Sequence, residues 1–282
     1  MSGAEEHNLT RVAVISDIHG NLAALQAVMD DIAEQAPDEV IVAGDLVGRG
    51  PGGEEVALRL METGWRALTG NHEQLLLHCR DSGPPANLTD TAMGAAAEWM
   101  AEELSHEVSD YLRELPFSLR SQLAPEHLLV VHGSPAGVSD GLGPWTPDAV
   151  LDRHATETPT QVLVCAHTHR PLDRTFDNGR IVNIGAVGLP FNRDPRAHYS
   201  IFEITAEQVT VHRRVVRYDL EATLRYSRTS GFSDHSPVIA ELLSREIRQA
   251  RPFLVKFIDW TTKQQLPQDA AALAEFDRWL PG

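Results

Sequence analysis

Short apolar runs alternate with helix-periodic segments in the first half of the chain. Residues 11–16 (RVAVIS), 39–44 (EVIVAG) and 65–70 (WRALTG) are mainly apolar, which predicts three buried strands. Between the first two runs, apolar side chains recur at helical spacing at Leu22, Leu25, Val28, Met29 and Ile32. A helix with one apolar face packs on a sheet, so the pattern is typical of strands that helices cover.

Strand-like segments return in the second half, at residues 126–132, 161–167, 180–185, 198–204 and 208–216. The later segments alternate apolar and polar residues, which indicates antiparallel strands with one face in water. Together with the first half, this order predicts an α/β fold in which two mixed sheets form a sandwich.

A helical insert is expected at about residues 75–116, between the third and fourth predicted strands. Residues 83–90 (GPPANLTD) are rich in turn formers, and the helical patterns at 91–104 and 106–115 end before Pro116. The sequence leaves two interpretations of the insert open: a pair of surface helices, or a cap close to a functional site.

The pattern changes again after residue 216. Residues 236–250 and 269–280 have helical periodicity, whereas residues 251–267 (RPFLVKFIDWTTKQQLP) match nothing that we can assign. We therefore divide the chain into a main domain, residues 1–216, and a C-terminal helical extension, residues 217–282. The extension is expected to pack on the core or on a second subunit, which leaves a homo-oligomer open.

Polar residues collect directly after the predicted strands. These positions hold Asp17, His19, Asp45, Asn71, His72, His132, His167 and His169. In open α/β sheets, the loops after the carboxyl ends of the strands form the ligand crevice. Each residue alone has an ordinary explanation, such as a helix cap, a turn or a satisfied hydrogen bond. All of them together are better explained by one dinuclear metal site, since carboxylate and imidazole groups suit Mn, Fe, Co, Ni and Zn.

The segment DIHGN at residues 17–21 illustrates the expected geometry. Side chains alternate along an extended chain, so Asp17 and His19 are expected to face one side while Ile18 turns away. Gly20 then gives the backbone freedom to leave the ions and begin the helix. The candidate ligands include no Cys, which argues against a structural zinc site.

Charge and cysteine content restrict the possible partners. The net charge of −16, with no long basic run, disfavours large nucleic acids and anionic membrane surfaces as partners. An anionic substrate would need local positive charge, which metal ions supply. Cys79 and Cys165 form no CxxC pair, the start MSGAEEHNLT is polar, and no apolar run reaches the ~20 residues of a membrane span. A cytoplasmic protein without a membrane segment is expected.

Five motifs occur in order: DIHGN at 17–21, GDLVGRG at 44–50, GNHE at 70–73, VHGSP at 131–135 and AHTHRP at 166–171. In this order and at these intervals, the series resembles the calcineurin-like metallophosphoesterases over roughly residues 11–216. The likeness is strongest to small bacterial phosphodiesterases and to the diadenosine-tetraphosphatase-like branch. The resemblance implies a four-layer sandwich of two mixed β-sheets flanked by helices.

The resemblance also implies a role for each motif residue. Asp17, His19 and His169 would hold one ion, Asn71, His132 and His167 would hold the other, Asp45 would bridge them, and His72 would be the catalytic imidazole. Two divalent ions, with manganese the first candidate and Fe, Ni, Co or Zn the alternatives, would share a hydroxide that attacks phosphorus.

Substrate recognition is less determined. Arg49 is the candidate substrate-binding residue, because its guanidinium group can grip a phosphate oxygen, although a solvent-exposed loop residue is the alternative. Arg170 and Arg196 are weaker candidates. Trp145 is expected either to stack on a base or to be a packed surface tryptophan. The pocket is expected to come from the insert, the 133–160 loop and the C-terminal extension.

The motifs also depart from those of relatives. Gly48 and Thr69 stand where Ser/Thr protein phosphatases have an Asp and an Arg, so protein phosphatase activity is the less favoured variant, and no partner that orients His72 is visible. Ala166 stands where Gly is more common, which would restrict the backbone slightly. Phosphodiesters, phosphomonoesters and dinucleoside polyphosphates remain open as substrates, and a non-catalytic binding protein is the alternative class.

Overall fold

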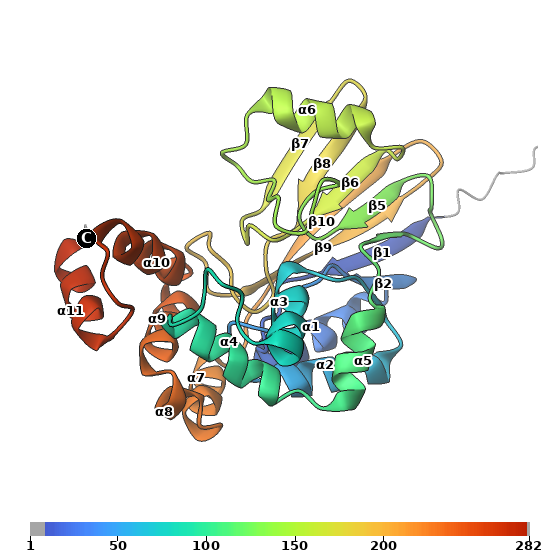
Figure 1. Ribbon diagram of the computed structural model, residues 1–282. Helices are drawn as coiled ribbons and strands as arrows, with labels where there is room; N and C mark the ends of the chain where they lie inside the picture. The colour runs from blue at the N-terminus through green and yellow to red at the C-terminus, as the bar shows by residue number, and fades with distance from the viewer. Residues whose placement is uncertain (1–8, 281–282) are drawn as a thin grey trace, which may run out of the picture.

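Two five-stranded mixed sheets form the centre of the computed structural model, which describes residues 9–280 (Figure 1). The order of the first sheet is β10 (Val209–Val216), β9 (Ala197–Ile204), β1 (Thr10–Ile15), β2 (Glu39–Val42) and β3 (Arg66–Ala67). The order of the second is β4 (Ser118–Arg120), β5 (Leu128–Val131), β6 (Val162–Cys165), β8 (Gly179–Asn183) and β7 (Leu172–Phe176). Each sheet combines parallel and antiparallel pairs, which confirms the predicted α/β sandwich.

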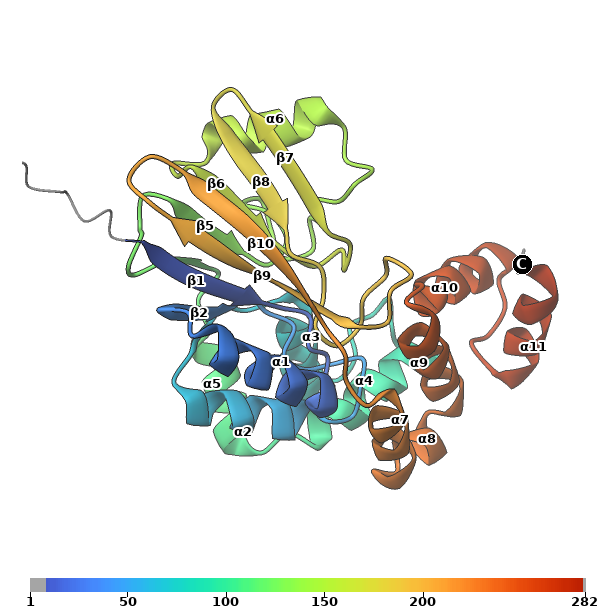
Figure 2. The ribbon, with the colours of Figure 1, turned by 180° about the vertical axis from the view of Figure 1, so that it is seen from behind.

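The sheets are the two inner layers of a four-layer structure (Figures 1 and 2). An apolar core lies between them, where Val12 and Val14 of β1 share a cluster with Val130 and Val164 of the second sheet. Helices α1 (Leu22–Gln35) and α2 (Gly53–Thr63) cover the outer face of the first sheet, and α6 (Asp148–Glu157) covers that of the second. This is the layer order that the sequence motifs imply.

Strand register brings the ends of the strands level with one another. Ile15 of β1 pairs with Val42 of β2, so the loops that follow these two strands leave the same edge of the first sheet. In the second sheet, Val130 of β5 pairs with Val164 of β6, and the Ala166 amide donates to the carbonyl of His132 (2.8 Å). The predicted ligands therefore begin at one common edge of the sandwich.

Within residues 9–216, four elements have no counterpart among the sequence predictions: α2, α6, β4 and β7. Strand β7 is an edge strand with largely exposed side chains, so its sequence, LDRTF, contains no apolar run. Strand β4 has three residues. Helix α2 has buried Val56, Ala57 and Leu60 at helical spacing, a stripe that was present in the sequence.

The helical insert comprises α3 (Asn71–Ser82), α4 (Ala92–Glu102) and α5 (His106–Glu114). The Thr91 and Ser105 side chains accept hydrogen bonds from amides in the first turns of α4 and α5, which satisfies groups that a helix start leaves free. Helix α5 ends before Pro116, as predicted, and Leu115 before the proline is extended.

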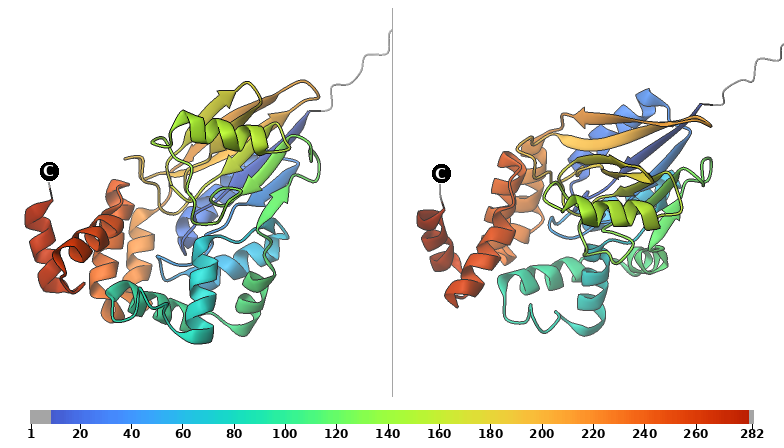
Figure 3. Two further views of the ribbon diagram at one scale, coloured as in Figure 1. Left: turned by 45° about the horizontal axis from the view of Figure 1, so that its top comes forward. Right: turned by 90° about the horizontal axis from the view of Figure 1, so that it is seen from above.

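Five consecutive helices follow β10 at one end of the molecule (Figures 2 and 3). They are α7 (Leu220–Thr229), α8 (Phe232–His235), α9 (Pro237–Gln249), α10 (Phe253–Gln264) and α11 (Ala270–Trp279). Helix α10 accounts for most of the segment that matched no pattern. No helix in residues 9–280 is both long and apolar enough to cross a bilayer. The first eight residues, which include most of the polar start, lie outside the described part, and the oligomeric state stays a prediction.

Candidate metal centre

The loops that carry the predicted ligands have an unusual backbone conformation. Asp17, His19, Asp45, His167 and His169 all have positive φ, between 52° and 62°. Residues with side chains rarely adopt this left-handed region, and strained conformations of this kind cluster at functional sites. Strand β1 ends at Ile15, so the expectation that alternation along an extended chain orients Asp17 and His19 is wrong. A tight left-handed turn orients them instead, and Ile18 is buried in the core.

Backbone hydrogen bonds join this turn to the loop after β2. The amides of Ile18 and His19 both donate to the carbonyl of Asp45, at 2.9 and 3.0 Å. Gly20 fits because a Cβ atom there would lie 2.7 Å from the carbonyl oxygen of Gly50. The two loops therefore form one rigid unit that places both aspartates.

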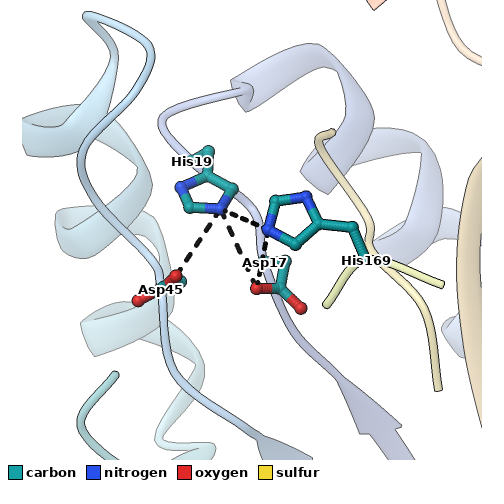
Figure 4. A group of neighbouring side chains, drawn as sticks. All are labelled: Asp17, His19, Asp45 and His169. Atoms are coloured by element: carbon teal, nitrogen blue, oxygen red, sulfur yellow. Dashed lines mark hydrogen bonds and ion pairs between the residues drawn. The ribbon is translucent and has the colours of Figure 1, made fainter. Parts of the chain in front are cut away.

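A first group of ligand atoms is formed by Asp17, His19, Asp45 and His169, all of them buried (Figure 4). One atom from each residue lies within 4.8 Å of those from the other three. His169 Nε2 lies 3.3 Å from Asp17 Oδ1, and His19 Nε2 lies 3.6 Å from Asp45 Oδ2. The Nε2 atoms of the two histidines are 3.1 Å apart. Two imidazole nitrogens converge on two carboxylates, as ligands around a cation do.

A second group shares Asp45 with the first. Asp45, His132 and His167 form it, and His132 Nε2 lies 3.2 Å from Asp45 Oδ2. The side-chain oxygen of Asn71, at the first position of α3, lies 3.1 Å from His132 Nε2 and 2.8 Å from His167 Nδ1. The structure thus brings together all seven ligands that the sequence resemblance implies, with Asp45 between the two groups.

Hydrogen bonds outside the site aim the imidazole rings at it. His132 donates from Nδ1 to the carbonyl of Ala43, and His169 donates from Nδ1 to that of Leu189. Each ring therefore directs Nε2 toward the site, the orientation that metal-binding histidines have. Within residues 9–280, Oδ1 of the fully buried Asp17 accepts no hydrogen bond. A buried carboxylate oxygen without a donor is costly unless a cation binds it, so the residues fit metal ions.

Burial and the charge of Asp45 act in opposite directions on the pKa values of the site's histidines. Burial lowers the pKa of His19 well below its ordinary value, although the Asp45 carboxylate acts against the shift. At His132, burial also disfavours the charged ring, but the adjacent Asp45 prevails and raises its pKa to about 10. Burial would raise the pKa of Asp45, yet the facing imidazoles hold it well below its usual range. The site therefore binds positive charge at His132, and metal ions compete with that proton.

His72 lies beside the ligands rather than among them. Its ring centroid is 4.9 Å from that of His19, and its amide donates to Asp45 Oδ1 (2.9 Å). Burial lowers its pKa to about 4, so the ring is neutral at pH 7. In the described residues, His72 Nδ1 has no hydrogen-bond partner. The ring packs on Gly48 instead, where a Cβ atom would lie 2.4 Å from Nδ1, and this contact explains why no acidic side chain occupies that position.

Glu73 is a site residue that the sequence predictions missed. Its fully buried carboxylate accepts hydrogen bonds from the amides of Asp45 and Leu46 (2.8 Å each), Val47 (3.2 Å) and Gly70 (2.6 Å). Burial, followed by the charge of Asp45, raises its pKa to about 7. A Glu three residues after the N-cap residue, here Gly70, is half of a capping box, and this signal was available in GNHE. Glu73 fixes the loop that carries the shared ligand.

The predicted substrate-binding residue, Arg49, lies next to the site but has a partner. Its guanidinium group forms a buried ion pair with Glu246 of α9, which also accepts the Leu254 amide (2.8 Å). Its substrate-binding role stays a prediction. Arg196 pairs with Asp194 and is exposed, outside the cavity described next. Nothing in the sequence indicated that Glu246 would contact Arg49.

A cavity of about 560 Å³ opens above the candidate ligands. Its lining residues come from the ligand loops, the 133–160 loop and the C-terminal helices: His19, Asp45, Arg49, Asn71, His72, Gly141, Trp145, His167, Thr168, His169, Arg170, Phe191, Pro252 and Val255. The 133–160 loop and the extension line it as expected. The rest of the insert, from residue 75 to 116, does not, so the cap interpretation is not supported for this cavity.

Ala166 adopts an ordinary backbone conformation, in contrast to its neighbour His167. It is not among the residues with positive φ, and its side chain is buried between the two sheets. The position therefore requires no glycine, and the methyl group fills part of the core.

Comparisons with known proteins agree with this geometry. Residues 10–207 match the protein family described as the calcineurin-like phosphoesterase superfamily domain. A curated relative from Paracidovorax citrulli, named symmetrical bis(5'-nucleosyl)-tetraphosphatase, is 37% identical over 151 residues, which cover 52% of this chain and 50% of the relative. The chain therefore spans about half the length of that relative.

Two solved structures share the fold along most of the chain. A metallophosphoesterase from Sphaerobacter thermophilus has a TM-score of 0.67 and 28% identity, covering 85% of this chain and 100% of that one. A hypothetical protein from Pyrococcus horikoshii has a TM-score of 0.70 and 25% identity, covering 83% and 97%. Because the family match extends over residues 10–207, the chain belongs to the calcineurin-like phosphoesterase superfamily.

Proposed function

We propose that the protein hydrolyses phosphate esters or anhydrides at a centre of two divalent metal ions, with manganese the first candidate. The observation that carries the proposal is the position of Asp45, whose carboxylate belongs to both groups of ligand atoms. One carboxylate between two ligand groups is the arrangement by which proteins hold two ions about 3.5–4 Å apart. The roles of all seven ligands, and of His72 and Arg49, are part of the proposal.

The metal ions would supply an activated water and neutralise the oxygens of the reacting phosphoryl group. Asp17, His19 and His169 would hold one ion, and Asn71, His132 and His167 the other. His72 faces the cavity with a neutral imidazole at pH 7, so it is suited to donate a hydrogen bond to a phosphoryl oxygen. At the transition state this hydrogen bond would stabilise the developing charge.

The substrate is an ester or anhydride of phosphoric acid in which a phosphoryl oxygen reaches the floor of the cavity. The name of the Paracidovorax citrulli relative supports a dinucleoside polyphosphate among the candidates. Gly48 leaves His72 without the acidic partner expected in Ser/Thr protein phosphatases, which disfavours that activity.

We further propose that the protein acts in the cytoplasm and that residues 217–282 form an extension of the main domain.

A direct test measures hydrolysis of bis(p-nitrophenyl) phosphate, p-nitrophenyl phosphate, diadenosine tetraphosphate and a phosphopeptide with Mn²⁺ added. The proposal expects turnover of one or more of the small substrates, with activity abolished by a chelator and strongly reduced in His72→Ala. Absence of turnover with every divalent metal, or unchanged activity in His72→Ala, would contradict it and favour a binding protein on the same fold.

A further inference from the structure

The mouth of the cavity carries two unusually exposed apolar side chains from distant parts of the chain. Trp145, in the loop before α6, is 58% exposed, and Val255, in the first turn of α10, is 56% exposed. Both line the cavity whose floor holds the candidate metal ligands. Exposed apolar side chains at the entrance of a polar cavity indicate contact with an apolar part of a ligand.

Trp145 is held in place from two directions. Its ring packs on Gly143, where a Cβ atom would lie 2.7 Å from the ring. The guanidinium carbon of Arg170 lies 5.0 Å from the ring centroid, within the range of a cation–π contact. Arg170 also donates from Nε to the carbonyl of Phe191 (3.1 Å), so its guanidinium group has a fixed position above the ring.

The two arginines of the cavity differ in whether a carboxylate neutralises their positive charge. The charge of Arg49 is neutralised by Glu246, whereas Arg170 forms no ion pair with any residue in the described range 9–280. In a protein of net charge −16, an unpaired cation next to the metal ligand His169 favours an anionic group at that position. A planar guanidinium group binds phosphate oxygens and also stacks on aromatic rings.

We propose that Trp145 and Arg170 form a nucleotide subsite, an inference that rests on the proposed phosphoesterase function. Arg170 binds an oxygen of the nucleotide's phosphate, and Trp145 contacts the base of the same nucleotide, with Val255 on the wall of the same cavity. The preferred substrates are therefore nucleotide derivatives, since a small phosphate ester carries no base for Trp145 to contact. Trp145 and Arg170 determine specificity and take no part in the cleavage.

The test compares two phosphodiesters with the same leaving group. The p-nitrophenyl ester of thymidine 5'-monophosphate carries a nucleoside, and methyl p-nitrophenyl phosphate does not. Base stacking on an aromatic side chain contributes about 1–3 kcal/mol, so Trp145→Ala should lower kcat/KM for the nucleoside ester about tenfold, mainly through KM. The loss of kcat/KM on the methyl ester should be much smaller. Trp279→Ala, which removes a tryptophan that is 55% exposed on α11, is the matched control and should affect neither ester.

A binding measurement separates this inference from the proposed function. Calorimetric titration of AMP into His72→Ala, with Mn²⁺ present, reports the subsite without turnover. Adding Trp145→Ala or Arg170→Ala should raise the Kd of AMP about tenfold, because a stacked base and a phosphate contact are lost. Trp145→Ala should leave the Kd of inorganic phosphate unchanged, and the exposed Arg174→Ala should leave the Kd of AMP unchanged.

Equal AMP affinity with and without Trp145, or equal losses of kcat/KM on both esters, would overturn the subsite. If neither ester is hydrolysed but AMP binding still depends on Trp145, the subsite stands and the proposed phosphoesterase function fails.

Discussion

The floor of the cavity and its rim are built in different ways. The floor consists of the seven candidate metal ligands. Each of them lies within four residues after the last residue of a strand. The rim consists of Arg49, Trp145, Arg170 and Val255, which come from loops and from the C-terminal helices. The floor is fixed by sheet register and backbone hydrogen bonds, whereas the rim depends on contacts between distant segments. We therefore expect the chemistry at the floor and the substrate specificity at the rim.

The floor provides the largest expected effect. Asp45→Asn keeps the shape of the side chain but removes the charge shared by both ligand groups, so both ions should bind more weakly. Activity with Mn²⁺ should fall at least about a thousandfold, which corresponds to about 4 kcal/mol of the barrier. Elemental analysis should find fewer than two ions per chain. Exposed Asp152→Asn is the control, and a variant that retains activity and metal content would remove Asp45 from its central position.

A substitution of His72, which lies beside the floor, tests catalysis separately from metal binding. Because its imidazole belongs to neither group of ligand atoms but faces the cavity, His72→Ala should lower kcat about a hundredfold through loss of one hydrogen-bond donor. Metal content should equal that of the unmodified protein. If metal content falls together with kcat, His72 is a ligand and not the catalytic imidazole.

The buried pair of Arg49 and Glu246 tests the connection between the rim and the C-terminal helices. Glu246→Gln leaves the buried guanidinium group without its counter-ion, which should lower the free energy of unfolding by about 3 kcal/mol. Urea unfolding measures this loss. The double variant Arg49→Met with Glu246→Gln should recover most of the stability, because no unpaired charge remains buried. Equal losses in the single and double variants would show that the pair contributes no specific interaction.

The smallest effect is expected at Ala166. Its methyl group fills the core between the sheets, and its backbone conformation is ordinary, so Ala166→Gly should cost about 1 kcal/mol of stability and leave activity unchanged. Thermal unfolding and a turnover assay check both parts. A gain in activity would indicate that the ligand loop needs more backbone freedom than the structure shows.

The floor was predictable because its signals are local. Asp17, Asp45, His132 and His167 follow apolar strands, and the parallel register then brings the ends of those strands together. The local geometry was not predictable, since strand alternation gives no hint of the left-handed turn at Asp17 and His19. Register and loop closure determine such turns, and periodicity does not report them.

The rim and the supporting contacts were only partly predictable. Glu246 lies 197 residues after Arg49, and no pattern in either segment indicates their contact. The sequence favours Arg49 over Arg170 as the substrate-binding residue, because it does not show that Glu246 neutralises the charge of Arg49. The sequence leaves two interpretations of Trp145 open, because the position of its ring depends on contacts with Gly143 and Arg170. Contacts between segments that are distant in the sequence become visible only in the folded structure.

The central claim, that two metal ions share Asp45, is tested most directly by anomalous diffraction from crystals soaked in Mn²⁺. Two manganese peaks about 3.5–4 Å apart are predicted, one among Asp17, His19 and His169, and the other among Asn71, His132 and His167, with Asp45 between them. A single peak, or peaks that lie away from these ligands, would contradict the account.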